Sequence, residues 1–247
     1  MWIDVVDLRD FYASDLGRIT RRMVRRKIRS IWPDVTGQNV LGLGYAGPYL
    51  QSFVGEAQRV VSAMPAGQGG LHWPDDPANL TGLVDELELP FDDLSRDRVI
   101  LVHALECADH VRPMMREIWR VLAGSGRLLV IVPNRRGLWA RFELTPFGHG
   151  LPYSQRQLSR LLRDNLFTPI ETHRALFMPP VRSRMMQSAA PALENIGSRF
   201  FSSFAGVNLM EAVKQIYAGQ PLAERKQRQR VVVVPQQSQR IPAGKGF

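Results

Sequence analysis

The stretch QNVLGLGYAGPYL, residues 38–50, decides the fold of this chain. It combines a short apolar strand, a turn that contains Gly42, Gly44 and Gly47, and the start of a helix. Glycine lets the backbone turn tightly and approach a ligand without a Cβ collision, and the start of a helix adds unpaired N–H donors. In an open α/β sheet, the crevice beyond such a strand holds nucleotide-like ligands. The stretch therefore predicts a backbone cradle at the carboxyl end of the leading strand.

The composition favours one domain with a large buried core. The chain has 247 residues, of which 45% are hydrophobic. Its single cysteine, Cys107, excludes an intrachain disulfide and suits a reducing compartment. No apolar run is long enough to span a bilayer, and the N-terminal segment MWIDVVDLRD lacks the hydrophobic core of a signal peptide. We therefore expect a cytoplasmic protein with no transmembrane segment.

The net charge of +9 raises the question of an anionic partner. Much of the positive charge lies in a predicted amphipathic helix that ends near Arg29. Such a helix can lie on phosphates or on a membrane, but it can equally pack on a sheet, with arginine stems covering apolar surface. The packed helix is favoured, because no aromatic platform accompanies the charge. Nucleic acid remains a partner that the sequence allows but does not favour.

The hydrophobic pattern alternates between strands and helices along the chain. Strands are predicted at residues 39–43, 59–63, 80–87, 97–102, 127–132, 168–177 and 230–234. Helices are predicted within residues 5–29, 48–54, 109–122, 154–165 and 178–218. This alternation indicates a parallel sheet with helices on both faces. The organisation expected is a basic helical segment at 1–37, an α/β core at 38–177, a helical insert at 178–222, and a last strand with a polar tail at 223–247.

Four blocks in this order carry a family resemblance: VLGLGYAG, DELELPF, LVHALE and EIWRVLAGSGRLLVIVPN. Together, over residues 38–166, they resemble the class I S-adenosylmethionine-dependent methyltransferases, especially the type 11 methyltransferase domain. The resemblance implies a three-layer α/β/α, Rossmann-like fold with a mostly parallel seven-stranded sheet. It also implies an antiparallel last strand after a helical insert, and S-adenosylmethionine as the cofactor.

The resemblance also assigns cofactor contacts to three strand ends. The glycine turn would pass under the methionine part, an acidic segment would read the adenine, and the end of the fourth strand would line the sulfonium. The residues so assigned are Gly42, Gly44, Tyr45, Gly47, Asp85, Glu86, Leu87 and His103. Tyr12 lies in a segment that can close over the cofactor. No catalytic residue is assigned, although His103 is placed where a base would face the methyl group.

No metal site is expected, because the five histidines form neither an HExxH motif nor a Cys/His cluster. Methyl transfer from a sulfonium often needs no metal, since positioning alone can lower its barrier by up to ~7–11 kcal/mol. The chemistry of the resemblance therefore agrees with the lack of metal-ligand motifs in the sequence.

Two carboxylates of the family pattern are missing. Gly42 stands where the first strand commonly carries an acid, and the end of the second strand, SAMP at residues 62–65, carries none for the ribose. A ribose without its carboxylate loses ~1.5–3 kcal/mol of charged hydrogen bonding. Three functions therefore stay open. They are a methyltransferase for a small-molecule acceptor, a catalytically silent methyltransferase-like binding or regulatory subunit with a protein partner at 178–218, and an RNA-modifying methyltransferase.

Overall fold

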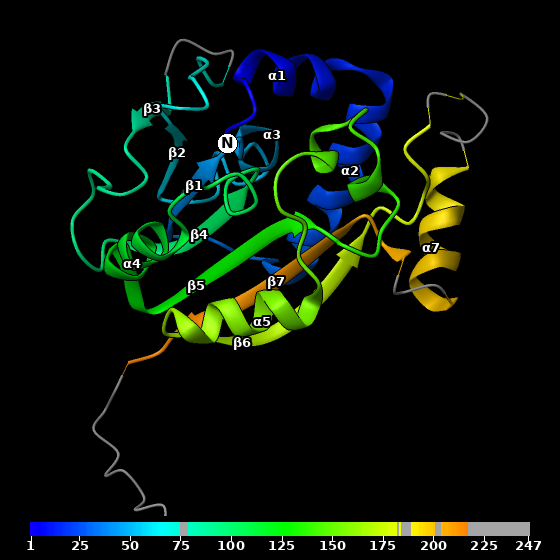
Figure 1. The fold of residues 1–247 in the computed structure, drawn as a ribbon. Coiled ribbons are helices and arrows are strands. Elements are labelled where there is room, and N and C mark those ends of the chain that lie inside the picture. Colours follow the sequence, from blue (N-terminus) through cyan, green and yellow to red (C-terminus); the bar gives the residue numbers. More distant parts are fainter. Residues whose placement is uncertain (75–78, 182, 184–188, 201–203, 217–247) are drawn as a thin grey trace, which may run out of the picture. The chain divides into compact units, whose positions relative to one another are not determined.

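The computed structural model describes residues 1–74, 79–181, 183, 189–200 and 204–216. A seven-stranded sheet lies at its centre (Figure 1). Its strands are β1 (Asn39–Gly44), β2 (Arg59–Pro65), β3 (Thr81–Val84), β4 (Arg96–Val102), β5 (Leu122–Pro133), β6 (Phe167–Ala175) and β7 (Val207–Lys214). The helices are α1 (Val5–Ala13), α2 (Asp15–Ile31), α3 (Gly47–Leu50), α4 (Val111–Val121), α5 (Gln155–Asp164) and α7 (Ala190–Phe200), with 3-10 turns η1 (Trp139–Arg141) and η2 (Pro146–Gly148).

The sheet has the order β3-β2-β1-β4-β5-β7-β6. The first five strands along the chain are parallel, and β7 runs antiparallel between β5 and β6. In this register Gly44 of β1 lies beside Val102 of β4, so these two strands end together. The predicted fold is confirmed: it is an α/β fold with a mostly parallel seven-stranded sheet and an antiparallel last strand.

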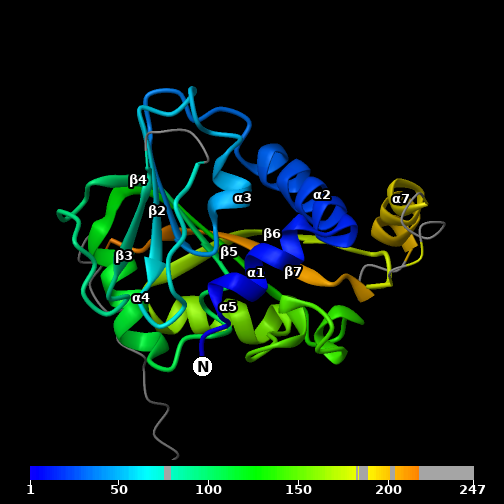
Figure 2. The ribbon, with the colours of Figure 1, turned by 90° about the horizontal axis from the view of Figure 1, so that it is seen from above.

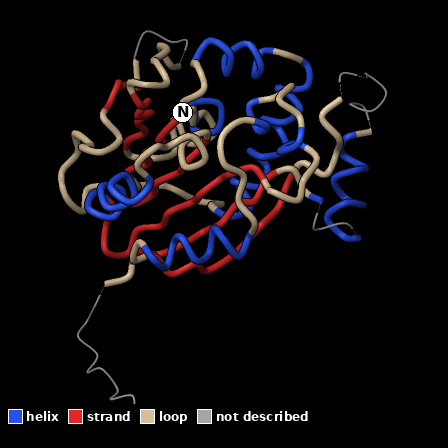
Figure 3. The backbone as a smooth tube through the Cα atoms, in the orientation of Figure 1, coloured by secondary structure: helices blue, strands red, loops and turns tan. Residues whose placement is uncertain are grey.

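Helices cover both faces of the sheet (Figure 2). Alternation along β1 shows why: Val40 faces the core formed with α1, α2 and α3, whereas Leu41 and Leu43 face the core formed with α4 and α5. Strands that are buried on both faces have no polar side, which is the pattern of a parallel sheet. The long loop between β5 and α5 contacts α1 through η2, and Figure 3 shows it among the loops at one end of the strands.

The basic helix α2 packs its apolar stripe on the sheet. Leu16, Val24 and Ile28 are buried, whereas its arginines are exposed or half-buried around that stripe. Arg29 shows how a basic side chain of this helix is used, because it pairs with Glu56 at 2.9 Å and lies over the Phe53 ring. The packed helix favoured by the sequence is therefore the one found. None of the described helices is long and apolar enough to cross a bilayer.

The position of the last strand corrects the sequence prediction. β7 lies within residues 178–218, which were predicted to be helical, and α7 is the described helix of that insert. The strand predicted at 230–234 lies outside the described residues. The sequence does not indicate β7, because a buried strand is expected to be apolar and this one carries Asn208, Glu211 and Lys214. Exposed apolar side chains on α7, such as Phe200, leave a protein partner in this region as a prediction.

Several element boundaries also differ from the prediction. The helix predicted at 48–54 is the short α3, and the strand predicted at 80–87 is limited to Thr81–Val84. β5 begins at Leu122, ahead of the predicted residue 127. Ser154 caps the start of α5, since its hydroxyl accepts from the Gln157 N–H and the Gln157 side chain accepts from the Ser154 N–H.

Candidate functional site

The predicted cradle forms at the carboxyl end of β1. Gly44 has a φ of +86°, and a Cβ atom there would lie 2.2 Å from the Val102 carbonyl oxygen. Glycine is required on both counts. The Tyr45 N–H donates to the same carbonyl at 2.9 Å, and α3 then begins at Gly47. The tight strand-to-helix turn predicted from the sequence is therefore present in the structure.

The side chain of Tyr12, from α1, fills the space over this turn. Its hydroxyl lies 2.8 Å from the Tyr49 hydroxyl and 2.9 Å from His103 Nε2, and its ring stacks on Tyr45 with centroids 5.5 Å apart. All four side chains are buried. Burial, with the Tyr49 phenol beside it, holds the pKa of Tyr12 well above its ordinary value, so the hydroxyl stays neutral and hydrogen-bonded.

The loop after β2 crosses the same space from the other side. Gln68 is only 2% exposed; its side-chain Nε2 donates to the His103 carbonyl at 3.0 Å, and its backbone carbonyl accepts from the Val5 N–H at 2.9 Å. The Trp73 ring covers the start of α3, because a Cβ atom on Gly47 would lie 3.2 Å from it. The Gln68 side chain thus connects the loop after β2 to the end of β4. The Gln68 backbone connects the same loop to the start of α1.

These residues do not fit an S-adenosyl group in the cradle. The space that the nucleoside would need holds Tyr12 and Gln68, and the end of β2 offers the buried Met64 in place of a carboxylate. The first missing acid has no room either. A Cβ atom on Gly42 would lie 2.5 Å from Ala46 Cβ and 2.6 Å from a Leu50 methyl carbon. The departures seen in the sequence therefore coincide with a cradle filled by the chain itself.

The structure brings together only part of the predicted site. Gly42, Gly44, Tyr45, Gly47 and His103 lie around the adjoining ends of β1 and β4. The acidic segment directly follows the edge strand β3, which β2 separates from β1 in the sheet.

That acidic segment forms an exposed turn. The Asp85 carboxylate accepts from the Leu87 N–H at 2.8 Å, and Glu86 is half-buried. The residues that follow are fastened by Arg120, which donates to the Leu89 and Phe91 carbonyls at 2.8 Å each. This turn is therefore well held, and the cradle contents do not cover it.

His103 has the surroundings of a core side chain. Its φ is +49° and its imidazole is fully buried. Nε2 meets the Tyr12 hydroxyl, the ring lies 4.7 Å from that of Phe147, and Nδ1 lies 3.4 Å from Glu106 Oε1. The predicted position at the end of β4 is the observed one, but the ring is enclosed by protein groups.

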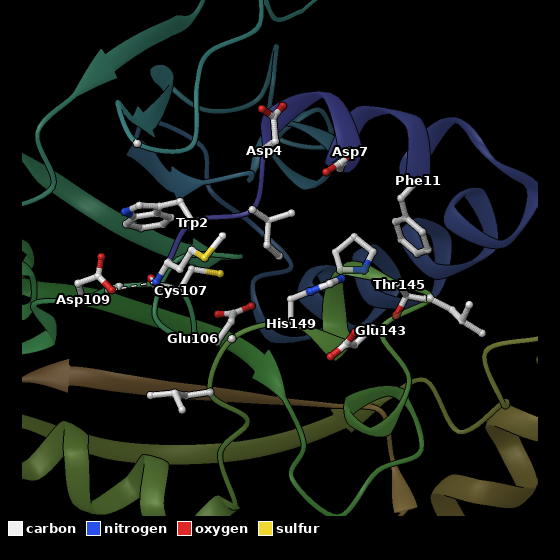
Figure 4. Close-up of a pocket in the computed structure, with 18 residues that line it drawn as sticks. Trp2, Asp4, Asp7, Phe11, Glu106, Cys107, Asp109, Glu143, Thr145 and His149 are labelled. Atoms are coloured by element: carbon white, nitrogen blue, oxygen red, sulfur yellow. Dashed lines mark hydrogen bonds and ion pairs between the residues drawn. The ribbon is translucent and has the colours of Figure 1, made fainter.

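A cleft of about 960 Å³ lies beside the cradle (Figure 4). It is enclosed by residues 1–4 with the outer side of α1, by residues 106–109 after β4, and by residues 143–151. Glu106 and Thr145, each 2% exposed, line this cleft and leave their side-chain oxygens without a hydrogen bond. Cys107 also lines it, and burial raises the pKa of its thiol to about 12, so it is no nucleophile at neutral pH.

Gln68, Glu106 and Thr145 are the residues that sequence reasoning missed. Gln68 lies in the glycine-rich segment between the strands predicted at 59–63 and 80–87, and nothing local marks it as buried. Glu106 does stand in the block LVHALE, three residues after His103, so its place beyond a strand end was a usable signal. Among the described residues, no group of three His, Cys, Asp or Glu side chains can hold a metal ion.

Comparison with known proteins identifies the fold. Residues 74–130 match the family model described as a methyltransferase domain. A search of curated proteins finds no match. Among solved structures, a methyltransferase from Haloferax volcanii, in complex with its methyltransferase activator, is similar with a TM-score of 0.61 at 18% identity. That alignment covers 87% of this chain and 100% of the other.

Two further structures agree. A methyltransferase from Thermotoga maritima, described as a possible histamine N-methyltransferase, gives a TM-score of 0.59 at 14% identity over 85% of this chain and 96% of the other. The 1,6-didemethyltoxoflavin-N1-methyltransferase of Burkholderia thailandensis, solved with S-adenosylhomocysteine, gives 0.51 at 14% identity over 86% and 85%. The chain has the class I methyltransferase fold, and the resemblance inferred from its sequence is confirmed.

Proposed function

We propose that this chain is a methyltransferase-fold binding protein, in which the adenosyl cradle is closed by the N-terminal segment and the neighbouring cleft is the ligand site. The observation that carries the proposal is Tyr12, buried over the glycine turn and hydrogen-bonded to Tyr49 and His103. The filled cradle agrees with the two missing carboxylates, because neither has a function where no cofactor binds. The cleft retains the open volume that the cradle lacks, and the buried side-chain oxygens of Glu106 and Thr145 in its lining have no hydrogen-bond partner among the described residues.

The energy needed to open the cradle supports this proposal. Exposing a buried aromatic side chain costs roughly 1.5–3 kcal/mol, and losing two hydrogen bonds at about 0.5–1.5 kcal/mol each adds to it. Removing Tyr12 from its site would therefore cost about 3–6 kcal/mol before Gln68 moves. A ligand that binds only the open form is weakened in proportion, by about 10²- to 10⁴-fold. The missing ribose carboxylate would weaken it further.

S-adenosylmethionine-dependent methylation of a small molecule is the second candidate. It is favoured by the match of residues 74–130 to a methyltransferase domain and by the exposed turn at Asp85, which the cradle contents leave open. In this case α1 would have to leave the cradle, and the bound sulfonium would supply the methyl group. The two candidates therefore differ in whether Tyr12 can be displaced by a nucleoside.

Isothermal titration calorimetry with S-adenosylhomocysteine separates the two candidates. The proposed function predicts no saturable heat with ligand up to about 1 mM. A one-to-one isotherm would overturn it and support the methyltransferase. In that event Tyr12→Ala would bind more tightly than the wild-type chain, because the side chain that competes with the nucleoside has been removed. Adenosine serves as the control for binding of the base alone.

A further inference from the structure

The charge of the cleft is opposite to that of the chain. The chain carries 32 Lys and Arg against 23 Asp and Glu. Among the described residues that line the cleft there is no Lys or Arg, and the acidic ones are Asp4, Asp7, Glu106, Asp109 and Glu143. Asp109 is paired with the Met1 amino group at 2.9 Å, and Asp4 accepts from the Val6 N–H at the start of α1. Acids gathered in a basic protein concentrate cations in this one place.

Buried oxygens without partners give the second, independent observation. Within the part of the chain that the structure describes, neither carboxylate oxygen of Glu106 accepts a hydrogen bond, and the Thr145 hydroxyl makes none. His103 Nδ1 lies 3.4 Å from Glu106 Oε1, and that nitrogen makes no hydrogen bond to any described residue. A buried carboxylate without donors is costly, so such groups are normally paired. Figure 4 shows the Glu106 carboxylate among the side chains that line the cleft, and both of its oxygens are buried there.

The walls of the cleft suit an apolar body attached to a charged group. Trp2 and Phe11 stand on opposite sides of the acidic centre in Figure 4, and both line the cleft. Aromatic faces attract cations as well as apolar groups, by about 0.5–2 kcal/mol for a cation at the ring. The neutral thiol of Cys107 adds no charge. The carboxylate at the centre of the cleft therefore suits a ligand with hydrogen-bond donors, and the aromatic rings at its sides suit an apolar part of that ligand.

We infer that the cleft binds an organic cation: a protonated amine whose N–H groups donate to Glu106 and whose apolar part lies between the aromatic rings. The inference rests on the proposed function, in that the cleft and not the cradle is taken as the ligand site. Glu106 requires a ligand with N–H donors, which a quaternary ammonium lacks. Asp7 and Glu143 are exposed at the rim and attract the cation without holding it.

Three small molecules of one shape test this inference on the full-length chain. The probe is the 2-phenylethylammonium ion, and the comparison compounds are 2-phenylethanol and the trimethylated ammonium. By calorimetry, the amine should bind at least about tenfold more tightly than the alcohol, as expected for a charged hydrogen bond. The trimethylated ion should bind more weakly than the amine. Equal binding of amine and alcohol, or no binding of the amine up to about 10 mM, would overturn the inference.

Variants locate the binding. Glu106→Gln should lower the affinity for the amine by about tenfold to a hundredfold while leaving that for the alcohol unchanged. Asp7→Asn should lower it about twofold in dilute buffer, and the matched change Asp10→Asn, on the same helix but outside the lining, should have no effect. If Glu106→Gln does not fold, selectivity for amine over alcohol and the Asp7/Asp10 pair still decide. Equal effects of those two changes would count against the site.

Failure of this inference can be told apart from failure of the proposed function. Binding of S-adenosylhomocysteine would show that the cradle opens, whatever the amine does. A chain that binds neither compound keeps the closed cradle but loses the cation site. A chain that binds the amine alone satisfies both.

Discussion

Removing one oxygen atom from Tyr12 should destabilise the protein measurably. Tyr12→Phe keeps the ring on Tyr45 but deletes the hydroxyl that joins Tyr49 at 2.8 Å and His103 at 2.9 Å. Two hydrogen bonds are lost, and their partners stay buried without water. At roughly 0.5–1.5 kcal/mol each, the free energy of unfolding should fall by about 1–3 kcal/mol.

Urea unfolding followed by circular dichroism measures this loss. With a slope of about 3 kcal/mol per molar urea, the midpoint should move down by about 0.3–1 M. Tyr153→Phe is the matched control, because Tyr153 is half-buried and its hydroxyl makes no hydrogen bond within the part of the chain that the structure describes. The control should change the free energy by less than about 0.5 kcal/mol.

Equal losses of unfolding free energy in Tyr12→Phe and Tyr153→Phe would contradict this prediction. If Tyr12→Phe also loses less than about 0.5 kcal/mol, the hydroxyl is not held in the cradle as described. A change in the slope, rather than in the midpoint, would instead indicate an altered unfolded or native state. Only a midpoint shift at constant slope supports the packed Tyr12.

Three further predictions use the same unfolding measurement. Gly42→Asp, which restores the acid of the family pattern, should destabilise by at least about 3 kcal/mol and gain no nucleoside binding, since α3 fills the space and the charge has no partner there; a stable variant that binds S-adenosylhomocysteine would contradict this. Stability should fall as the pH rises above the ordinary tyrosine pKa of 10.0, because the pKa values of Tyr12 and Tyr49 are raised in the folded state and only the unfolded chain ionises there; an alkaline profile unchanged in Tyr12→Phe would oppose it. Glu117→Gln should cost about 1–2 kcal/mol at neutral pH, and the loss should vanish in acid, because the hydrogen bond from Arg120 lowers the pKa of this carboxyl and its contribution is lost as the pH falls below the ordinary 4.5.

Local chemistry made much of the fold predictable. The glycine turn after β1, the apolar strands β4 and β5, and the Ser154 cap each depend on residues close in sequence. Short buried strands bounded by turns, alternating with amphipathic helices, leave few arrangements other than a parallel sheet covered on both faces. The order of the elements from β1 to β6 could therefore be predicted from the sequence.

β7 shows what local chemistry could not give. Its polar side chains find hydrogen-bond partners far away in the sequence: Trp32 Nε1 donates to Glu211 at 2.9 Å, and Lys214 Nζ donates to the Leu122 carbonyl at 3.0 Å. These partners are 179 and 92 residues away. A central strand can therefore carry charges that, in the sequence alone, indicate a surface helix.

The contents of the cradle were hidden for the same reason. Tyr12 meets His103 across 91 residues, and Gln68 meets it across 35. In the sequence, Tyr12 lies in a segment able to close over a cofactor, and the missing carboxylates indicate a catalytically silent protein as an alternative. That the closing residue occupies the cradle itself follows only from packing. Glu106 differs, because its place just after a strand end is visible in the sequence.

The most direct test of the closed cradle is a crystal structure of the full-length chain grown with excess S-adenosylhomocysteine. We expect the Tyr12 hydroxyl to remain within hydrogen-bond distance of Tyr49 and His103, and Gln68 Nε2 to keep its hydrogen bond to the His103 carbonyl. Nucleoside density against Gly44, with the Tyr12 ring moved out of contact with Tyr45, would contradict it.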